Sequence, residues 1–531
     1  MKKTSRIFAL LLAAALLLMC FACGKAPSTD ASKPQAETKE AEPQATPVPV
    51  EQQAASAAQA KATKPNLVIG ADQQVTTLDP MESATFVHYR VFHMTHDPLF
   101  FLDDGTGEIF NMLATGYEWQ DQLTLKVTLR DDVLFHNGEK FTSDDVVFSM
   151  ERAKTSKASK SYVKQLESVE AVDDTTVVFH MSSAYLDFVY NLARCPLSIL
   201  NREACEADVE NGYRIGTGMF QIEDFVLNDY VLLRRFDKCY KGTTPTETVK
   251  VRYIPEASAR VIALQNGEID YCVSPSNMEL DYIKNDSTLK LYSWDSMMEY
   301  YLGFNGTGKS EVCMNDKLRQ AVAMALNKQD IIAVALNGYG VEAYSFWGQF
   351  AYAYTPDVGY KYDVEAAKAL VAEAGYANGL DIHLLVSGNI CVAAAQIVQS
   401  QLKQIGLNVI IEEADSSGFM SKSDAGEFDM LIYTRTQNPW GDAIRINVSE
   451  GSSSNRVHYY NPKVVELMDL AVGELDEAKR IDLYHQVQEL VASDAFYIPI
   501  CYSTQFAGAN ADLQNVVPTN QSPDFSYAYI G

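Results

Sequence analysis

One stretch of the sequence matches a pattern that binds nucleotide phosphates. Residues 303–310 read Gly-Phe-Asn-Gly-Thr-Gly-Lys-Ser and satisfy the phosphate-loop pattern GxxxxGK[ST]. Such a loop works because a helix begins at its lysine and directs backbone N–H groups at the anion. Here the next apolar stripe of helical spacing begins only at Leu318, behind the pair Asn315-Asp316, which is typical of a helix N-terminus. The sequence therefore favours a loop without nucleotide chemistry.

Three histidines lie close together on a predicted helix. His93 and His96 share a face of that helix with the spacing that two metal ligands could use, and His88 lies one turn earlier. No carboxylate pattern accompanies them. Packing among ordinary polar and aromatic positions is the favoured interpretation, so we expect no metal and no cofactor.

Hydrolytic residues form no recognisable pattern either. The sequence has no HExxH motif, no GxSxG motif and no Cys/His nucleophile spacing. We expect a protein that is not an enzyme, and an exported hydrolase stays a remote alternative.

The cysteines do not form a metal or redox motif. Seven lie beyond residue 23 and none is part of a CxxC pair, which argues against a thiolate metal site. An odd number cannot pair completely, and whether the two closest form a disulfide is left open. The seven are Cys195, Cys205, Cys239, Cys272, Cys313, Cys391 and Cys501.

The N-terminus has the features of an export signal. Basic residues precede an apolar run over 7–19, which is too short to span a bilayer. Ala22 then stands before Cys23 and a glycine, as before the lipidated cysteine of a bacterial lipoprotein, although Cys20 stands where leucine is usual. We predict a signal peptide over 1–22 and lipidation of Cys23, with an ordinary secretory signal as the alternative. The protein would then lie on the extracytoplasmic face of the cell membrane.

Composition separates the next segment from the rest. Residues 23–65 are rich in Ala, Gln, Glu, Lys, Ser, Thr and Pro and contain few large apolar side chains, so we expect a flexible linker. The chain of 531 residues is long enough for two or three domains. Its formal charge of −26 argues against nucleic acid or an anionic membrane surface as an electrostatic partner.

The elements that must position any site are clearest over residues 123–154. Leucine and valine alternate with polar residues from Leu123 to Arg130, which predicts a half-buried strand. Asn137-Gly138 predicts a tight turn. Residues 142–145, Thr-Ser-Asp-Asp, predict a capping box at the start of a helix.

Later segments predict an α/β fold. Residues 254–270 read as a strand and a helix that ends near Gly267. A helix is predicted over 363–374, and residues 381–412 predict two parallel strands joined by a helix. A last helix, over 478–492, precedes a strand at 496–500.

The stretch from Leu129 to Val146 resembles the signature of the family 5 extracytoplasmic solute-binding proteins of ABC importers, the dipeptide, oligopeptide and nickel class. Residues 215–220, 254–270 and 300–305 resemble further blocks of that family, so the likeness covers residues 66 to about 510. The residues in register with the signature are Leu129, Arg130, Val133, Phe135, His136, Gly138, Phe141, Thr142, Asp145 and Val146.

The resemblance implies a fold and partners. It implies an α/β protein of the type 2 periplasmic-binding-protein class, with two α/β lobes, an extra small subdomain (cluster C type) and the ligand in the interlobe cleft. It also implies a monomer that works with ABC permease subunits. Lobe I would comprise 66–104, 214–302 and 499–531, the small subdomain 105–213 and lobe II 303–498.

The ligand question falls on residues 428–443. In peptide-binding members an aspartate in this region holds the peptide ammonium, and Asp442 would suit that role. Arg435 would suit a carboxylate, bidentately. A salt bridge is the alternative for each. Trp440 and Trp347 could stack on a ligand or belong to the core.

Residues 428–443 match neither the pattern of the peptide-binding branch nor that of the nickel or metallophore branch. Arg435 stands where peptide binders tend to have tryptophan, and the histidine usual in the nickel or metallophore branch is missing. We expect a short peptide first and a nickel or metallophore complex second. The candidate ligand-binding residues are Arg435, Asp442, Trp440, Tyr433, Trp347, Asn305 and Asp79.

Overall fold

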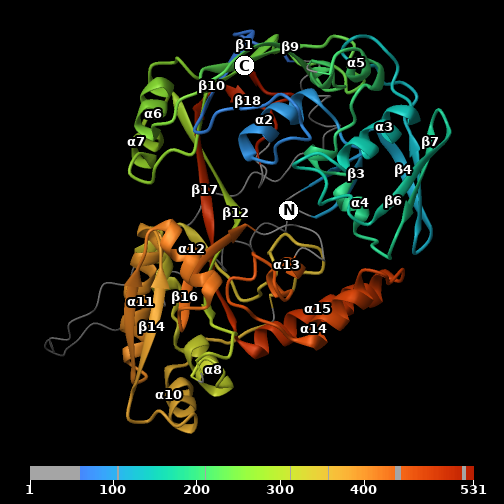
Figure 1. Cartoon of the computed structure of the whole chain (residues 1–531). Coiled ribbons are helices and arrows are strands. Elements are labelled where there is room, and N and C mark those ends of the chain that lie inside the picture. Colours follow the sequence, from blue (N-terminus) through green and yellow to red (C-terminus); the bar gives the residue numbers. More distant parts are fainter. Residues whose placement is uncertain are drawn as a thin grey trace, which may run out of the picture. The chain divides into compact units, whose positions relative to one another are not determined.

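The computed structural model describes residues 60–103, 107–209, 211–310, 312–356, 358–436, 444–516 and 522–531 (Figure 1). Contacts divide the chain into residues 1–39 and 40–531, and all described residues belong to the second unit. No helix of this described part combines the length and the apolar character needed to cross a membrane.

A mixed sheet of 11 strands dominates the described chain, in the order β15-β14-β16-β12-β17-β11-β1-β10-β9-β8, with β13 paired to β17. β1 is parallel to β10 and β11, and β14 is parallel to β15 and β16. The strands are β1 (Asn66–Ala71), β8 (Phe220–Val226), β9 (Tyr230–Arg235), β10 (Thr248–Tyr253), β11 (Tyr271–Val273), β12 (Leu289–Phe304), β13 (Gly340–Glu342), β14 (Leu380–Val386), β15 (Leu407–Glu413), β16 (Met430–Thr436) and β17 (Tyr497–Asn510).

A second sheet has the order β4-β5-β7-β6 and is antiparallel throughout. Two short pairs, β2 with β3 and β18 with β19, complete the described strands. Their bounds are β2 (Phe100–Leu102), β3 (Ile109–Asn111), β4 (Ala114–Asp121), β5 (Thr124–Leu129), β6 (Leu166–Asp173), β7 (Thr176–Met181), β18 (Leu513–Gln514) and β19 (Tyr529–Ile530).

Most of the helices bury apolar side chains against the sheets or against one another, and α5 buries none. They are α2 (Phe86–Thr95), α3 (Ser143–Ala153), α4 (Phe188–Asn191), α5 (Arg202–Ala207), α6 (Ala257–Gln265), α7 (Leu280–Asn285), α8 (Asp316–Ala325), α9 (Lys328–Ala335), α10 (Val364–Glu373), α11 (Asn389–Lys403), α12 (Ser416–Ala425), α13 (Arg445–Val448), α14 (Pro462–Ala471) and α15 (Glu477–Asp494), with 3₁₀ turns at Cys195–Leu197 and Gly212–Arg214.

Several local predictions are confirmed. The capping box of α3 is present, with the Thr142 N–H donating to Asp145 Oδ2 at 2.9 Å. Gly138 has the positive φ of 89° that its turn requires. The helix predicted over 363–374 is α10, which Asp363 caps by accepting a hydrogen bond from the N–H of Ala366. The predicted parallel unit is β14, α11 and β15.

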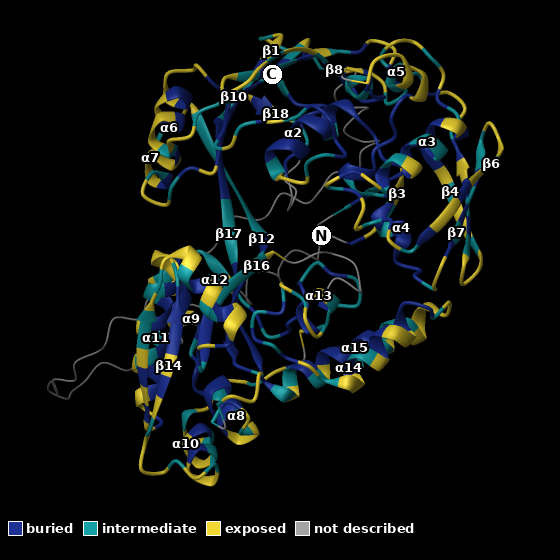
Figure 2. Ribbon diagram, viewed as in Figure 1, coloured by how far each residue is buried: buried dark blue, intermediate teal, exposed yellow. Residues whose placement is uncertain are grey.

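Three large hydrophobic cores lie under these elements. The first is built from residues between 300 and 501, the second from β1, α2, β10 and β11, and the third from the second sheet with α3. β17 is buried over most of its length (Figure 2) and contributes Ile500 to the first core and Ala507 to the second. β12 likewise places Leu302 in the first core and packs Tyr292 against the second. These two strands therefore connect the first two cores.

Candidate ligand-binding site

Arg435 lies on β16, directly opposite Glu299 of β12. Its Nε donates to Glu299 Oε2 at 2.6 Å, and its Nη1 donates to Asn447 Oδ1 at 3.2 Å. Nη2 donates to the carbonyl of Phe346, whose ring centroid lies 3.1 Å from the guanidinium carbon. The side chain is 8% exposed and that of Glu299 is fully buried. Each guanidinium nitrogen thus has an internal partner, and the assignment of Arg435 to a ligand stays a prediction.

Trp347 and Tyr433 lie in or against the first core. The Trp347 ring is buried beside Tyr484, and its Nε1 donates to the carbonyl of Tyr352 at 3.0 Å. The Tyr433 ring stacks on Phe419 with the centroids 4.8 Å apart. Tyr433 is half-buried, so part of it can still meet solvent or a solute.

Asn305 follows the last residue of β12 and is buried. Its amide donates to the carbonyls of Gly426 and Phe428, and its Oδ1 accepts from both the N–H and the hydroxyl of Thr307. These bonds join the loop after β12 to the loop between α12 and β16.

Asp79 is held by Arg152 of α3. Both carboxylate oxygens accept from the guanidinium, and Oδ1 also accepts the N–H of Met81 at 3.0 Å. The pair ties the loop after β1 to the helix that the capping box begins. The ligand role expected for Asp79 also stays a prediction.

Three of the predicted residues lie outside the described residues. They are Trp440 and Asp442, which follow β16, and the lipidation site Cys23.

The loop that matches the phosphate pattern does not lead into a helix. β12 ends at Phe304, and α8 begins only at Asp316, where Asn315 Oδ1 accepts the N–H of Leu318 at 3.2 Å. The predicted helix start at Asn315 is confirmed. Lys309 donates instead to the carbonyl of Ala425 at 2.6 Å.

The three histidines do not converge. The Nε2 of His88 accepts the N–H of Thr76 at 3.0 Å, His93 stacks on Tyr89, and His96 Nε2 lies 2.9 Å from the carbonyl of Tyr213. Burial lowers the pKa of His88 and of His96 to about 4. In the described part of the chain no three His, Cys, Asp or Glu side chains are grouped as metal ligands. Cys195 and Cys205 are free thiols.

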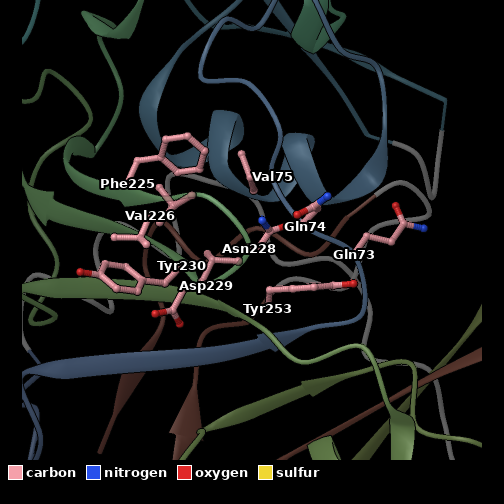
Figure 3. A pocket seen from close by; sticks show the side chains of 11 residues that line it. Gln73, Gln74, Val75, Phe225, Val226, Asn228, Asp229, Tyr230 and Tyr253 are labelled. Atoms are coloured by element: carbon pink, nitrogen blue, oxygen red, sulfur yellow. The ribbon is translucent and has the colours of Figure 1, made fainter.

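A small pocket opens beside the end of β1 (Figure 3). About 220 Å³ of empty space, including open solvent, lies between residues 73–75 and the hairpin of β8 and β9, with Tyr253 as a further wall. Asn228, at the hairpin turn, has a positive φ of 65°. None of the predicted ligand residues lines this pocket.

A second small pocket contains a lysine that the sequence reasoning missed. Lys328 donates to the carbonyl of Ala343 at 2.5 Å, and its ammonium lies 3.8 Å from the Tyr344 ring centroid. Burial lowers the pKa of Lys328 to about 7. Only the apolar spacing after Asn327 could have indicated that this lysine is enclosed.

Two charged residues were also missed. Glu299, the partner of Arg435, lies among aromatic residues of a strand that the sequence outlined only at its end. Arg90 is buried on α2. The sequence could have indicated its burial, because this arginine lies in a helix of mostly apolar and aromatic residues that contains no acid. The helix reads Phe-Val-His-Tyr-Arg-Val-Phe-His-Met-Thr.

The chain matches the family model described as bacterial extracellular solute-binding proteins, family 5 Middle, over residues 108–455. Among individual relatives, heme-binding protein A of Haemophilus influenzae is 27% identical over 467 residues, which cover 80% of this chain and 84% of that protein. The dipeptide-binding protein of Escherichia coli is 28% identical over 456 residues, which cover 78% and 84%. These relatives are solute-binding transport proteins and not enzymes.

Solved structures share the fold. The ABC transporter substrate-binding protein CtaP of Listeria monocytogenes superposes with a TM-score of 0.78 at 23% identity, covering 88% of this chain and all of that one. NikA of Staphylococcus aureus, in complex with Ni(L-His)2, gives a TM-score of 0.67 at 23% identity over the same shares. The fold predicted from the sequence, the type 2 periplasmic-binding-protein class, is confirmed. The chain belongs to family 5 of the bacterial extracellular solute-binding proteins, the substrate-binding proteins of ABC importers.

Proposed function

We propose that this protein is the lipid-anchored binding component of an ABC importer, and that it captures a short peptide by closing two lobes around it. Family membership supports the importer role. The dipeptide-binding relative from Escherichia coli, matched over most of both chains, supports a peptide as the cargo. The Ala22-Cys23 junction supports the anchor.

The geometry of β12 and β17 carries the closure proposal. These strands pair along their length, and each reaches two hydrophobic cores. Their register breaks between Asp295, opposite Thr504, and Glu299, opposite Tyr502. Such an irregularity interrupts the ladder of hydrogen bonds and lets a strand bend. A hinge at this point would let the two cores turn toward each other with their packing intact.

Recognition of the peptide then needs one group for each of its ends. We propose Asp442 as the acceptor for the ammonium and Trp440 as an apolar wall, because both follow β16 where the peptide-binding pattern of the family has its acid. Arg435 is bonded to Glu299 and Asn447, so the carboxylate of the peptide calls for a different cation.

Native mass spectrometry of protein extracted from membranes in mild detergent, without refolding, tests this proposal. We expect masses of bound short peptides, and a mature chain that begins at Cys23 and carries lipid. Asp442→Asn should lose the peptides, whereas Asp469→Asn, at an exposed ion pair with Arg445, should keep them. Detection of a bound metal with a carboxylate chelator, in place of peptides, would show that the cargo is of the nickel type. A mature chain without lipid would contradict the proposed anchor.

A further inference from the structure

Arg90 is a buried cation on α2, a helix that packs against the second core. Val87, Val91 and Phe92 of the same helix belong to that core. Arg90 is 4% exposed, comparable to these apolar neighbours. An arginine stays protonated in proteins, so its charge has been removed from water together with its side chain.

The guanidinium of Arg90 has no bonding partner in the described chain. Its Nε and Nη1 are enclosed and donate to no acceptor atom, and no ion pair involves Arg90 among the described residues. Burial lowers its pKa. A buried charge of this kind is costly unless an anion and hydrogen-bond acceptors compensate it.

Two other buried arginines show how this protein satisfies such a group when its role is structural. Arg260 of α6, 3% exposed, donates to the carbonyls of Val273, Ile254, Pro255 and Ser274 at 2.7 to 2.9 Å. Arg319 donates from all three nitrogens, to the carbonyls of Asp494 and Cys313 and to the Asp316 carboxylate. Arg90 differs from both.

A second donor lies near Arg90. The ring of Tyr271 on β11 is buried against Phe525, and its hydroxyl takes part in no hydrogen bond within the described residues. The guanidinium of Arg90 acts to lower the pKa of this phenol against the rise caused by burial, and Tyr271 and Asp72 act to raise the pKa of Arg90. Tyr271 also belongs to the same hydrophobic core as Val87 and Val91, the residues of α2 on either side of Arg90, so two unused donors lie beside one core.

The neighbours of Arg90 mark an edge of the sheet. Asp72, whose charge raises the pKa of Arg90, follows the last residue of β1, and Arg260, whose charge lowers it, is bonded to carbonyls just after β10 and at the end of β11. β1, β10 and β11 are parallel, so this is their shared carboxyl end. Open α/β sheets bind ligands outside the carboxyl ends of their parallel strands.

We propose that Arg90, with the Tyr271 hydroxyl, forms a subsite that receives a carboxylate of the bound solute. This deepens the proposed function and rests on it, because the C-terminal carboxylate of a short peptide is the group in question. A guanidinium offers two parallel N–H donors to the two oxygens of a carboxylate. A monoanion suits the place better than a dianionic phosphate, since the acid Asp72 is close by.

Stability of the ligand-free protein gives the first test. Arg90→Met removes a buried charge that makes no hydrogen bond and no ion pair, so its melting temperature should rise above that of the wild type. Arg260→Met is the matched control: it removes a guanidinium bonded to four carbonyls and should lower the melting temperature. If Arg90→Met lowers it as much as Arg260→Met does, Arg90 is structural and the proposal fails.

A minimal anion tests the subsite without any peptide. The probe is propionate, titrated into protein labelled with ¹⁵N-arginine, and the readout is the Nε–H resonance of Arg90, assigned by its loss in Arg90→Lys. That resonance should move with propionate, whereas the Arg260 resonance, bonded to Val273, should not. An unmoved Arg90 resonance overturns the inference whatever the peptide measurements give.

Alanine peptides of two to four residues, each as the free acid and as the C-terminal amide, connect the subsite to the cargo. Free acids should bind the wild type about 10- to 100-fold more tightly than amides, a preference that Arg90→Met should abolish. Equal binding of acid and amide overturns the inference. If propionate moves the Arg90 resonance but no peptide binds in either form, the subsite stands and the peptide proposal fails.

Discussion

The guanidinium of Arg435 joins three segments that are far apart in the sequence. It bonds Glu299 on β12, the carbonyl of Phe346 in a loop, and Asn447 on α13. Breaking a buried ion pair leaves the other charge without compensation, which costs more than the pair contributes as a whole. Glu299 is the first residue of β12 to pair with β17 after the register break, so the ion pair lies at the proposed hinge.

We expect Arg435→Met to destabilise the protein by about 3–5 kcal/mol, because Glu299 would remain buried and charged. The double variant Arg435→Met/Glu299→Leu should recover part of that loss. Urea unfolding measures both. A loss below about 1 kcal/mol in the single variant, the value of an exposed pair, would contradict the burial of this contact.

At the residue scale the sequence indicated which side chains were unusual but not their partners. Arg435 was singled out, yet Glu299 lies 136 positions earlier, and only sheet pairing brings the two together. Asp79 was likewise singled out without Arg152 of α3. Arg90 was missed because its significance depends on the absence of acceptors around it, which no spacing in the sequence reveals.

Helix α3 shows how an element can be specified locally. The Thr142 N–H donates to the Asp145 carboxylate across the first turn. The sequence of residues 142–145 predicts this cap without any knowledge of the fold. We expect Thr142→Ala to lower the unfolding free energy by about 1 kcal/mol.

Thr128→Ala, at an exposed position of β5, is the control, and it should change the unfolding free energy by less than about 0.5 kcal/mol. Urea unfolding of both variants provides the comparison. Equal effects of the two substitutions would mean that the cap does not stabilise α3.

The longest strands were the least predictable elements. The sequence outlined β12 only at 300–305 and β17 only at 496–500, whereas they extend over Leu289–Phe304 and Tyr497–Asn510. The outer half of β12 mixes apolar, charged, aromatic and small residues, and that of β17 consists mostly of small and polar residues. They are strands because each pairs with the other over two cores, and tertiary pairing of this kind overrides local propensity.

For the whole molecule, buried histidines should link folding to pH. Burial lowers the pKa of His88 and His96 from 6.5 to about 4 in the folded state. The unfolded chain therefore takes up protons more readily, and stability should fall as pH decreases from about 6.5 toward 4. Each such histidine contributes a slope of about 1.4 kcal/mol per pH unit in that window.

Urea unfolding at pH 7 and pH 5 measures this dependence. His96→Gln should flatten it, because the buried imidazole that excludes the proton is gone. The same dependence in His96→Gln as in the wild type would show that His96 titrates normally in the folded protein.

The pairing of β17 between β11 and β12 has a consequence for biogenesis. Thr63 donates to the carbonyl of Ile530 at 2.8 Å, and β1 shares its sheet with strands that arrive more than 400 residues later. The core around β1 therefore cannot close while the distal part of the chain is still being made. A protein of an extracellular family must cross a membrane before it works, and this order of assembly leaves the core around β1 open until the end of the chain arrives.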